Sequence, residues 1–193
     1  MDNCDNLLTE YLKNISQKIN PVFKYFNLTQ YDIVSLGLII NGIGLLYLLT
    51  NNFYLFLICL LLAHFCNILN ILYVKQFNIP TQYGNNYDNL ANWFKVVLTL
   101  LLFIEVYSKK VNDNHFYLAV SLLILCNIHY SIKTCLKKKI GKKIDYYMEC
   151  WIKPICKLKK EDLDYYCIFT KYFDENAVFI YLTILMIYIH HKI

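Results

Sequence analysis

The chain has 193 residues, of which 58% are hydrophobic and 17% are charged, and its formal net charge is +5 at pH 7. A soluble domain of this size rarely needs so apolar a composition. The composition therefore argues against a soluble enzyme or a soluble binding module, and it predicts a membrane protein.

An amphipathic helix is predicted near the N-terminus. Leu8, Leu12, Ile15 and Ile19 recur at helical spacing, and the segment carries its acidic residues early and its lysines late. Such a helix either lies on the membrane surface or docks on the rest of the protein, and the sequence leaves both interpretations open. We expect residues 1–32 to form a cytosolic or interfacial segment.

Five membrane-spanning helices are predicted. Residues 33–74 contain no Asp, Glu, Lys or Arg, and these 42 residues are enough for two spans joined by a turn at residues 50–52. The other three spans are expected at Leu90–Tyr107, His115–Ile132 and Ala177–Ile189. Because the runs are continuously apolar, we predict an all-α integral membrane protein, a helical bundle rather than a barrel.

The whole chain, residues 1–193, is predicted to form a single membrane domain. A four-span core at residues 33–132 is followed by a basic segment at 133–175 and by the last span at 176–193. Eleven lysines lie in the basic segment, and cytosolic segments near span ends carry the lysine excess. We therefore expect the N-terminus and the stretch 67–92 to face the cytosol.

The basic segment has two interpretations. It fixes the orientation of the neighbouring spans, or it attracts anionic headgroups or nucleotide phosphates to the cytosolic face. Nothing in it resembles a nucleic-acid-binding module, so no nucleic-acid partner is expected. Its cysteines, Cys135, Cys150, Cys156 and Cys167, are expected to stay reduced in the cytosol.

The third predicted span carries two charged residues, Lys95 and Glu105, near its opposite ends. Long charged side chains near the ends of a span usually extend toward water. We expect this behaviour for both residues.

A polar, Asn-rich stretch at residues 67–92 separates the second and third spans. Asn67 and Asn70 are three residues apart and share one helix face. Gly84, Asp88 and Asn92 are each four residues apart and share another face. Since a proline at position 80 prevents one continuous helix, two helix ends are expected to bring these residues together beside Lys75.

This spacing resembles the signature of the CDP-alcohol phosphatidyltransferase family, D-x2-D-G-x2-A-R-x8-G-x3-D-x3-D. Asn67, Asn70, Asp88 and Asn92 stand at the four Asp positions, Lys75 at the Arg and Gly84 at the second Gly. Ile71 and Val74 stand at the first Gly and the Ala, so only Gly84 and Asp88 are identical to the signature. The resemblance covers about residues 20–132, in a family whose members usually have six spans.

The resemblance implies transfer of a substituted phosphate from a CDP-linked donor, such as CDP-diacylglycerol, to an alcohol with release of CMP, a reaction of phospholipid biosynthesis. It implies a site for Mg²⁺ or Mn²⁺ at Asp88, Asn67, Asn70 and Asn92, with Lys75 and Gly84 on the substrate. Asn92 stands at the position of the general base, but an amide has no usable basicity. Membrane lipid is the implied partner, and the resemblance is also compatible with a homodimer.

Three interpretations follow. The first is a family member with reduced or lost transferase activity that retains nucleotide or lipid binding. The second is a working enzyme whose metal ions are recruited by substrate phosphates and Asp88. The third is an unrelated, non-catalytic membrane scaffold. The sequence leaves all three open.

Overall fold

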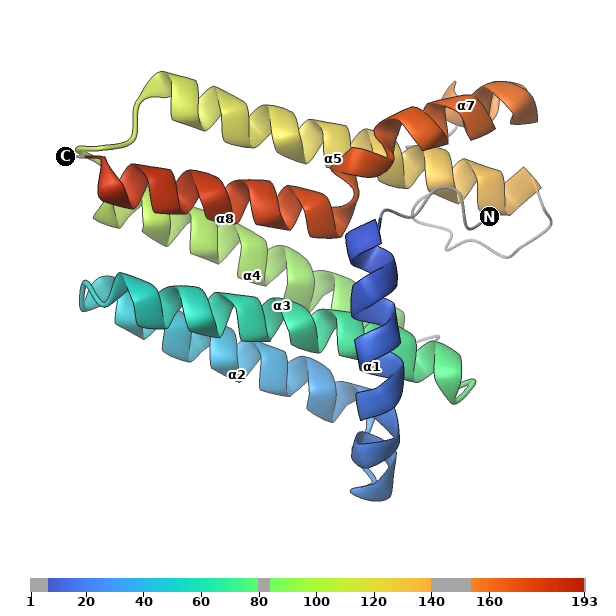
Figure 1. The fold of residues 1–193 in the computed structure, drawn as a ribbon, viewed down its shortest axis with the longest axis horizontal. Helices are drawn as coiled ribbons and strands as arrows, with labels where there is room; N and C mark the ends of the chain where they lie inside the picture. The colour runs from blue at the N-terminus through green and yellow to red at the C-terminus, as the bar shows by residue number, and fades with distance from the viewer. Residues whose placement is uncertain (1–6, 80–83, 140–153, 193) are drawn as a thin grey trace. The chain divides into compact units, whose positions relative to one another are not determined.

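The computed structural model describes residues 7–79, 84–139 and 154–192, and every regular element in them is a helix (Figure 1). In chain order the elements are α1 (Leu7–Tyr25), α2 (Gln30–Leu49), α3 (Phe53–Gln76), α4 (Gly84–Val106), α5 (Asp113–Lys139), α7 (Lys160–Thr170), the short 3-10 helix η2 (Lys171–Phe173) and α8 (Glu175–His191). They form two compact units. The motif unit comprises Tyr11–Val111 and Tyr188–Ile193, and the C-terminal unit consists mainly of Asn112–Ile187.

Polar residues set both ends of α2. At its start the Thr29 N–H donates to Asp32 Oδ2 at 2.7 Å and the Asp32 N–H donates to Thr29 Oγ1 at 3.3 Å, which is a capping box. Beyond its end, Asn51 has a φ of 60°, in the left-handed region that asparagine tolerates better than most residues. Because α3 begins at Phe53, the predicted turn at residues 50–52 is confirmed.

Within the motif unit, α2 packs against α3 and α4. A β-carbon on Gly44 would lie 2.8 Å from Cys59 Cβ of α3, which is closer than two non-bonded carbons approach. Only glycine fits this contact without a shift of its neighbours. Small residues at a helix interface allow the two backbones to approach closely, which is common in membrane bundles.

We expect Gly44→Ala to destabilise the protein by about 1–3 kcal/mol, because the added methyl group must displace Cys59 or separate α2 from α3. Gly42 is a matched control, since a β-carbon there meets nothing within 4 Å. Gly42→Ala should be neutral or slightly stabilising, as alanine favours the helix. Thermal unfolding of both variants in detergent is the measurement, and equal midpoints would contradict the close packing at Gly44.

The outward faces of these helices are apolar. Ile39 and Leu46 of α2 are 61% and 63% exposed, and Ile58 of α3 is 53% exposed. Large apolar side chains on a continuous outer face are typical of a surface that contacts lipid or a partner. Among the described residues, four helices are long and apolar enough to cross a membrane: Gln30–Leu49, Phe53–Gln76, Asp113–Leu136 and Lys160–His191.

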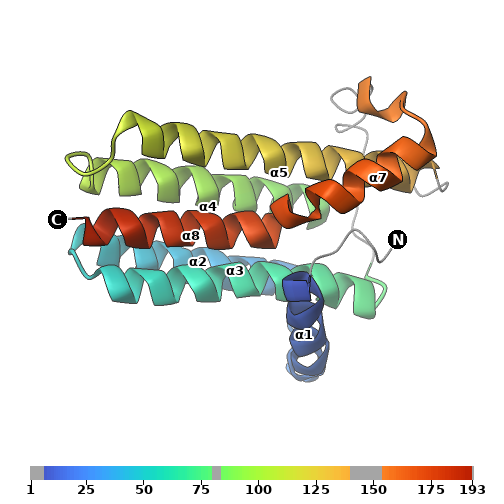
Figure 2. The same cartoon turned by 45° about the horizontal axis from the view of Figure 1, so that its top comes forward.

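The first helix, α1, runs crosswise to α2 and α3 and lies against the C-terminal end of α3 (Figures 1 and 2). Asn20 Nδ2 donates to Gln76 Oε1 at 3.1 Å. Ile19 and Phe23 pack against a buried cluster that includes Tyr73. The second half of α1 therefore docks on the rest of the protein, which is one of the two arrangements that the sequence left open.

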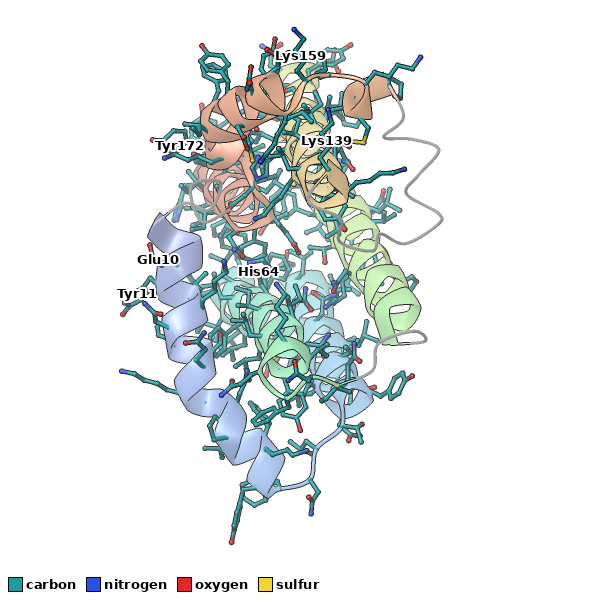
Figure 3. All side chains as sticks on the ribbon, turned by 90° about the vertical axis from the view of Figure 1, so that its right-hand side faces the viewer. Glu10, Tyr11, His64, Lys139, Lys159 and Tyr172 are labelled. Atoms are coloured by element: carbon teal, nitrogen blue, oxygen red, sulfur yellow. A yellow bond between two sulfur atoms is a disulfide. The ribbon has the colours of Figure 1, made fainter. Side chains whose placement is uncertain are left out.

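In the C-terminal unit, α7 packs against α5. Leu163 and Cys167 of α7 are fully buried, and they form one cluster with Ile132, Cys135 and Leu136 of α5. Lys139 Nζ, at the end of α5, donates to the carbonyl oxygen of Leu158 just before α7 (Figure 3). The basic segment predicted at 133–175 thus contains a helix, α7, that was not predicted, because its apolar stripe is short and gives too weak a pattern.

A disulfide joins Cys135 of α5 to Cys156, 21 residues further along the chain. Cys167 is also disulfide-bonded, while Cys150 lies outside the described residues. The prediction that these thiols stay reduced is therefore wrong for Cys135, Cys156 and Cys167. The fold brings the Cα atoms of Cys135 and Cys156 to 5.1 Å, within the range that a disulfide spans.

Candidate functional site

The structure places the six candidate residues on two helices of the motif unit. Three lie on α3, namely Asn67, Asn70 and Lys75, and three lie on α4, namely Gly84, Asp88 and Asn92. The motif therefore runs from the end of one helix into the start of the next. Residues 80–83 and the side chain of Asp88 lie outside the part of the chain that the structure describes.

Lys95 of α4 meets the motif from inside the bundle. Its side chain is only 5% exposed, and its Nζ donates a hydrogen bond to Asn67 Oδ1 of α3. The prediction that Lys95 extends toward water is therefore wrong. The physical reason lies on α2, where a β-carbon on Gly37 would be 3.7 Å from Lys95 Nζ, so that the missing side chain leaves room for the ammonium group.

A second buried polar contact lies one helical turn away. Thr99 Oγ1 of α4 donates to Asn41 Oδ1 of α2 at 3.4 Å, and both residues are at most 5% exposed. We give the name polar seam to five polar residues of α2, α3 and α4: Asn41, Asn70, Lys95 and Thr99, which are buried, and Asn67, which is half-buried. Buried polar groups between membrane-type helices are costly and are usually kept for a function.

Asn70 is the least satisfied residue of the polar seam. It is fully buried, and neither its Oδ1 nor its Nδ2 has a hydrogen-bond partner within the described residues. A buried amide group in this state costs about 1–3 kcal/mol for each lost hydrogen bond. Such a group marks a position where a further polar partner belongs.

The sequence motif contains Asn67 and Asn70 but not the three other members of the polar seam. Lys95 and Thr99 follow Asn92 at three and seven residues, which places them near one helix face. That spacing is a usable signal for α4. Asn41 sits in an apolar run with no polar residue at helical spacing beside it, so only the packing of α2 on α4 reveals it.

The divalent cation that the resemblance implies does not fit Asn67 in this arrangement. The amide oxygen that would bind the cation already accepts a hydrogen bond from the Lys95 ammonium group. A divalent ion about 4 Å from that ammonium would be repelled by about 8 kcal/mol at an effective dielectric constant of about 20. No group of three or more His, Cys, Asp or Glu side chains gathers among the described residues to offset this charge.

The remaining candidates are more exposed. Asn92 is half-buried, and Lys75 is exposed at the penultimate position of α3. Lys75 lines a cavity together with Lys13, Gln17, Leu72 and Gln76. The candidate site thus has a buried part around Lys95 and an exposed part around Lys75.

Comparison of the chain with known protein families, with curated proteins and with solved structures finds no match in any of the three. Among the residues themselves, Lys95 Nζ donates to the side-chain oxygen of Asn67, which stands at a metal-ligand position of the resembled signature.

Proposed function

We propose that the chain is a multi-pass membrane protein of the CDP-alcohol phosphatidyltransferase type that binds a CDP-linked lipid without a metal ion and has lost the transfer reaction. The contact between Lys95 and Asn67 carries this proposal. Through this contact, Lys95 supplies a positive charge at a position where the resembled enzymes require a divalent cation.

The arrangement of the motif supports the family part of the proposal. The resembled signature crosses from one span into the next, and here the corresponding residues lie on the last turns of α3 and the first turns of α4. Asn67 and Lys95 bring these two helices into contact. The positions of the signature thus fall on two consecutive helices that share a hydrogen bond.

The chemistry of the residues supports loss of transfer. Phosphoryl-type transfer depends on positive charge that offsets the phosphate oxygens, together with a base for the acceptor hydroxyl. Lys95 and Lys75 supply positive charge for binding a pyrophosphate. Asn92, at the position of the base, cannot accept a proton at neutral pH.

The membrane arrangement is also part of the proposal. We add α4 to the four spanning helices, since Phe94, Val97 and Leu101 are 47–61% exposed and form an apolar outer face. With five spans, α1 lies at the interface. Two observations bear on orientation and disagree: the lysine excess directs the end of α5 to the cytosol, whereas a disulfide at Cys135 favours an oxidising compartment.

The test is binding and turnover of CDP-diacylglycerol by the purified chain in detergent. We expect binding that is unchanged by EDTA and no release of CMP with inositol, glycerol phosphate or serine as acceptor. Lys95→Met should weaken binding at least about tenfold, since a buried hydrogen bond to a charged group is worth about 1.5–3 kcal/mol. Lys109→Met, which removes an exposed lysine in the turn that follows the C-terminal end of α4, is the matched control.

Two results would overturn the proposal. Release of CMP that requires Mg²⁺ or Mn²⁺ and disappears in Asp88→Asn would identify a working enzyme. Absence of any CDP-diacylglycerol binding by the folded chain would remove the link to the family.

The burial of the polar seam favours a second candidate function, a non-catalytic membrane scaffold. Lys95 is 5% exposed and donates to the half-buried Asn67, and such a hydrogen bond between two packed helices is typical of a structural contact. On this alternative, Lys95→Met lowers thermal stability while the parent protein binds no CDP-linked lipid. The same binding experiment therefore separates the two candidates.

A further inference from the structure

A cavity of about 380 Å³ lies between α1 and the C-terminal end of α3. Its lining residues come from both helices and are Lys13, Gln17, Leu72, Lys75 and Gln76. We call it the α1–α3 cavity. We propose that it binds the phosphate group of an anionic lipid, a site that goes beyond the proposed function and shares only Lys75 with it.

The walls of the α1–α3 cavity are fixed by hydrogen bonds rather than by loose contact. Gln76 Oε1 accepts from Asn20 Nδ2 at 3.1 Å, and Gln76 Nε2 donates to the Gln17 carbonyl oxygen at 3.4 Å. One side chain of α3 is thus bonded to two residues of α1. The end of α3 is therefore held against α1 before a ligand arrives, which reduces the entropic cost of ordering the two helices on binding.

The lining matches the chemistry of a phosphate. Lys13 and Lys75 bring two ammonium groups to one opening, and lysine binds phosphate as a compact positive charge. The described lining residues include no carboxylate that would repel an anion. Leu72, which is 8% exposed, contributes an apolar side chain to the lining.

The position of α1 favours a lipid over a free phosphate compound. α1 crosses the end of α3, which is one of the helices able to span a membrane (Figure 1). Tyr11, Val22 and Tyr25 of α1 are 53–82% exposed. Exposed aromatic residues beside the end of a span are typical of the headgroup level, so the α1–α3 cavity opens where lipid phosphates lie.

The experiment measures affinity of the purified full chain in detergent for dioctanoyl phosphatidic acid, with dioctanoylglycerol as the neutral lipid and inorganic phosphate as the free anion. We expect Lys13→Gln to weaken phosphatidic acid binding about 5-fold, and the double variant Lys13→Gln/Lys75→Gln about 30-fold, from the typical contribution of each lysine near a membrane surface. Lys18→Gln removes an exposed lysine of the same helix that does not line the cavity, and it should have no effect.

Three results would overturn the proposal. An unchanged affinity in the double variant would show that the cavity does not bind the lipid, and an equal loss in Lys18→Gln would show diffuse attraction to positive charge. Competition by inorganic phosphate at the same concentration as the lipid would make a free phosphate compound the ligand. Failure of the proposed function is a separate outcome, because Lys95→Met affects CDP-diacylglycerol binding and should leave phosphatidic acid binding unchanged.

Discussion

Removing Lys95 is expected to convert the polar seam into a site for a divalent cation once acidic residues are restored. The variant in which we expect this result combines Lys95→Met with Asn67→Asp, Asn70→Asp and Asn92→Asp. We expect it to bind Mn²⁺ at least about 30-fold more tightly than the triple variant that keeps Lys95. The Lys95 ammonium group is hydrogen-bonded to the side-chain oxygen of residue 67, so it would compete with the ion for that oxygen.

The expected difference is large. A divalent ion about 4 Å from an ammonium group is repelled by about 8 kcal/mol at an effective dielectric constant of about 20. Even a quarter of this repulsion energy, about 2 kcal/mol, would lower the Mn²⁺ affinity about 30-fold. Titration with Mn²⁺ followed by electron paramagnetic resonance gives both affinities directly. Lys109→Met added to the three acidic substitutions serves as the control for loss of one positive charge.

Equal Mn²⁺ affinity in the triple and quadruple variants would show that Lys95 does not prevent metal binding at the site. No binding in either variant would show that positions 67, 70 and 92 do not converge with Asp88. The second outcome would also count against the register of the resembled signature.

Loss of the disulfide between Cys135 and Cys156 should destabilise the C-terminal unit. The bond closes a loop of 21 residues, and a loop of this length corresponds to about 3 kcal/mol of stabilisation through restriction of the unfolded chain. We expect Cys156→Ser to lower the free energy of unfolding by about this amount. Cys126→Ser is the matched control, because Cys126 is a free, half-buried cysteine of the same unit.

Denaturant unfolding with and without dithiothreitol measures this effect. Reductant should destabilise the parent protein more than Cys156→Ser, in which only the disulfide of Cys167 is left to reduce. A parent protein that is insensitive to reductant would contradict a stabilising role for the disulfide.

The same cysteines test the orientation of the chain. Alkylation with a maleimide-linked polymer, applied after the cells are lysed in acid and the protein is denatured, labels free thiols only. Complete protection of Cys135 and Cys156 would place the end of α5 in an oxidising compartment, whereas labelling would place it in the cytosol. With five spans, the motif at residues 67–92 lies on the same side as the end of α5, so protection would also argue against a cytosolic CDP-linked donor.

Local sequence patterns predicted the helices well where hydrophobic runs and turn residues coincide. The uncharged run at residues 33–74 and the Asn51–Asn52 turn gave α2 and α3, and the span predicted at His115–Ile132 lies within α5. The capping residues Thr29 and Asp32 then fix where α2 begins. These signals depend only on residues that are close together in the sequence, so they can be recognised before the fold is known.

The contacts between helices were not predictable in the same way. Periodicity shows that Lys95 shares a face with Asn92, but it does not show which residue of α3 stands opposite or that Gly37 leaves room for an ammonium group. Pairing of cysteines likewise cannot be deduced from spacing alone. The α1–α3 cavity depends on how α1 crosses α3, and two lysines 62 positions apart in the chain give no local sign of it.

The contact between Lys95 and Asn67 has one further consequence. A bound metal ion exchanges with solvent, and its occupancy follows the supply of that ion in the cell. A charge on a side chain of α4 is tethered, so its effective concentration at the site is constant. Any ligand of the polar seam would therefore meet the same positive charge under metal starvation, in the presence of a chelator or in metal-replete conditions.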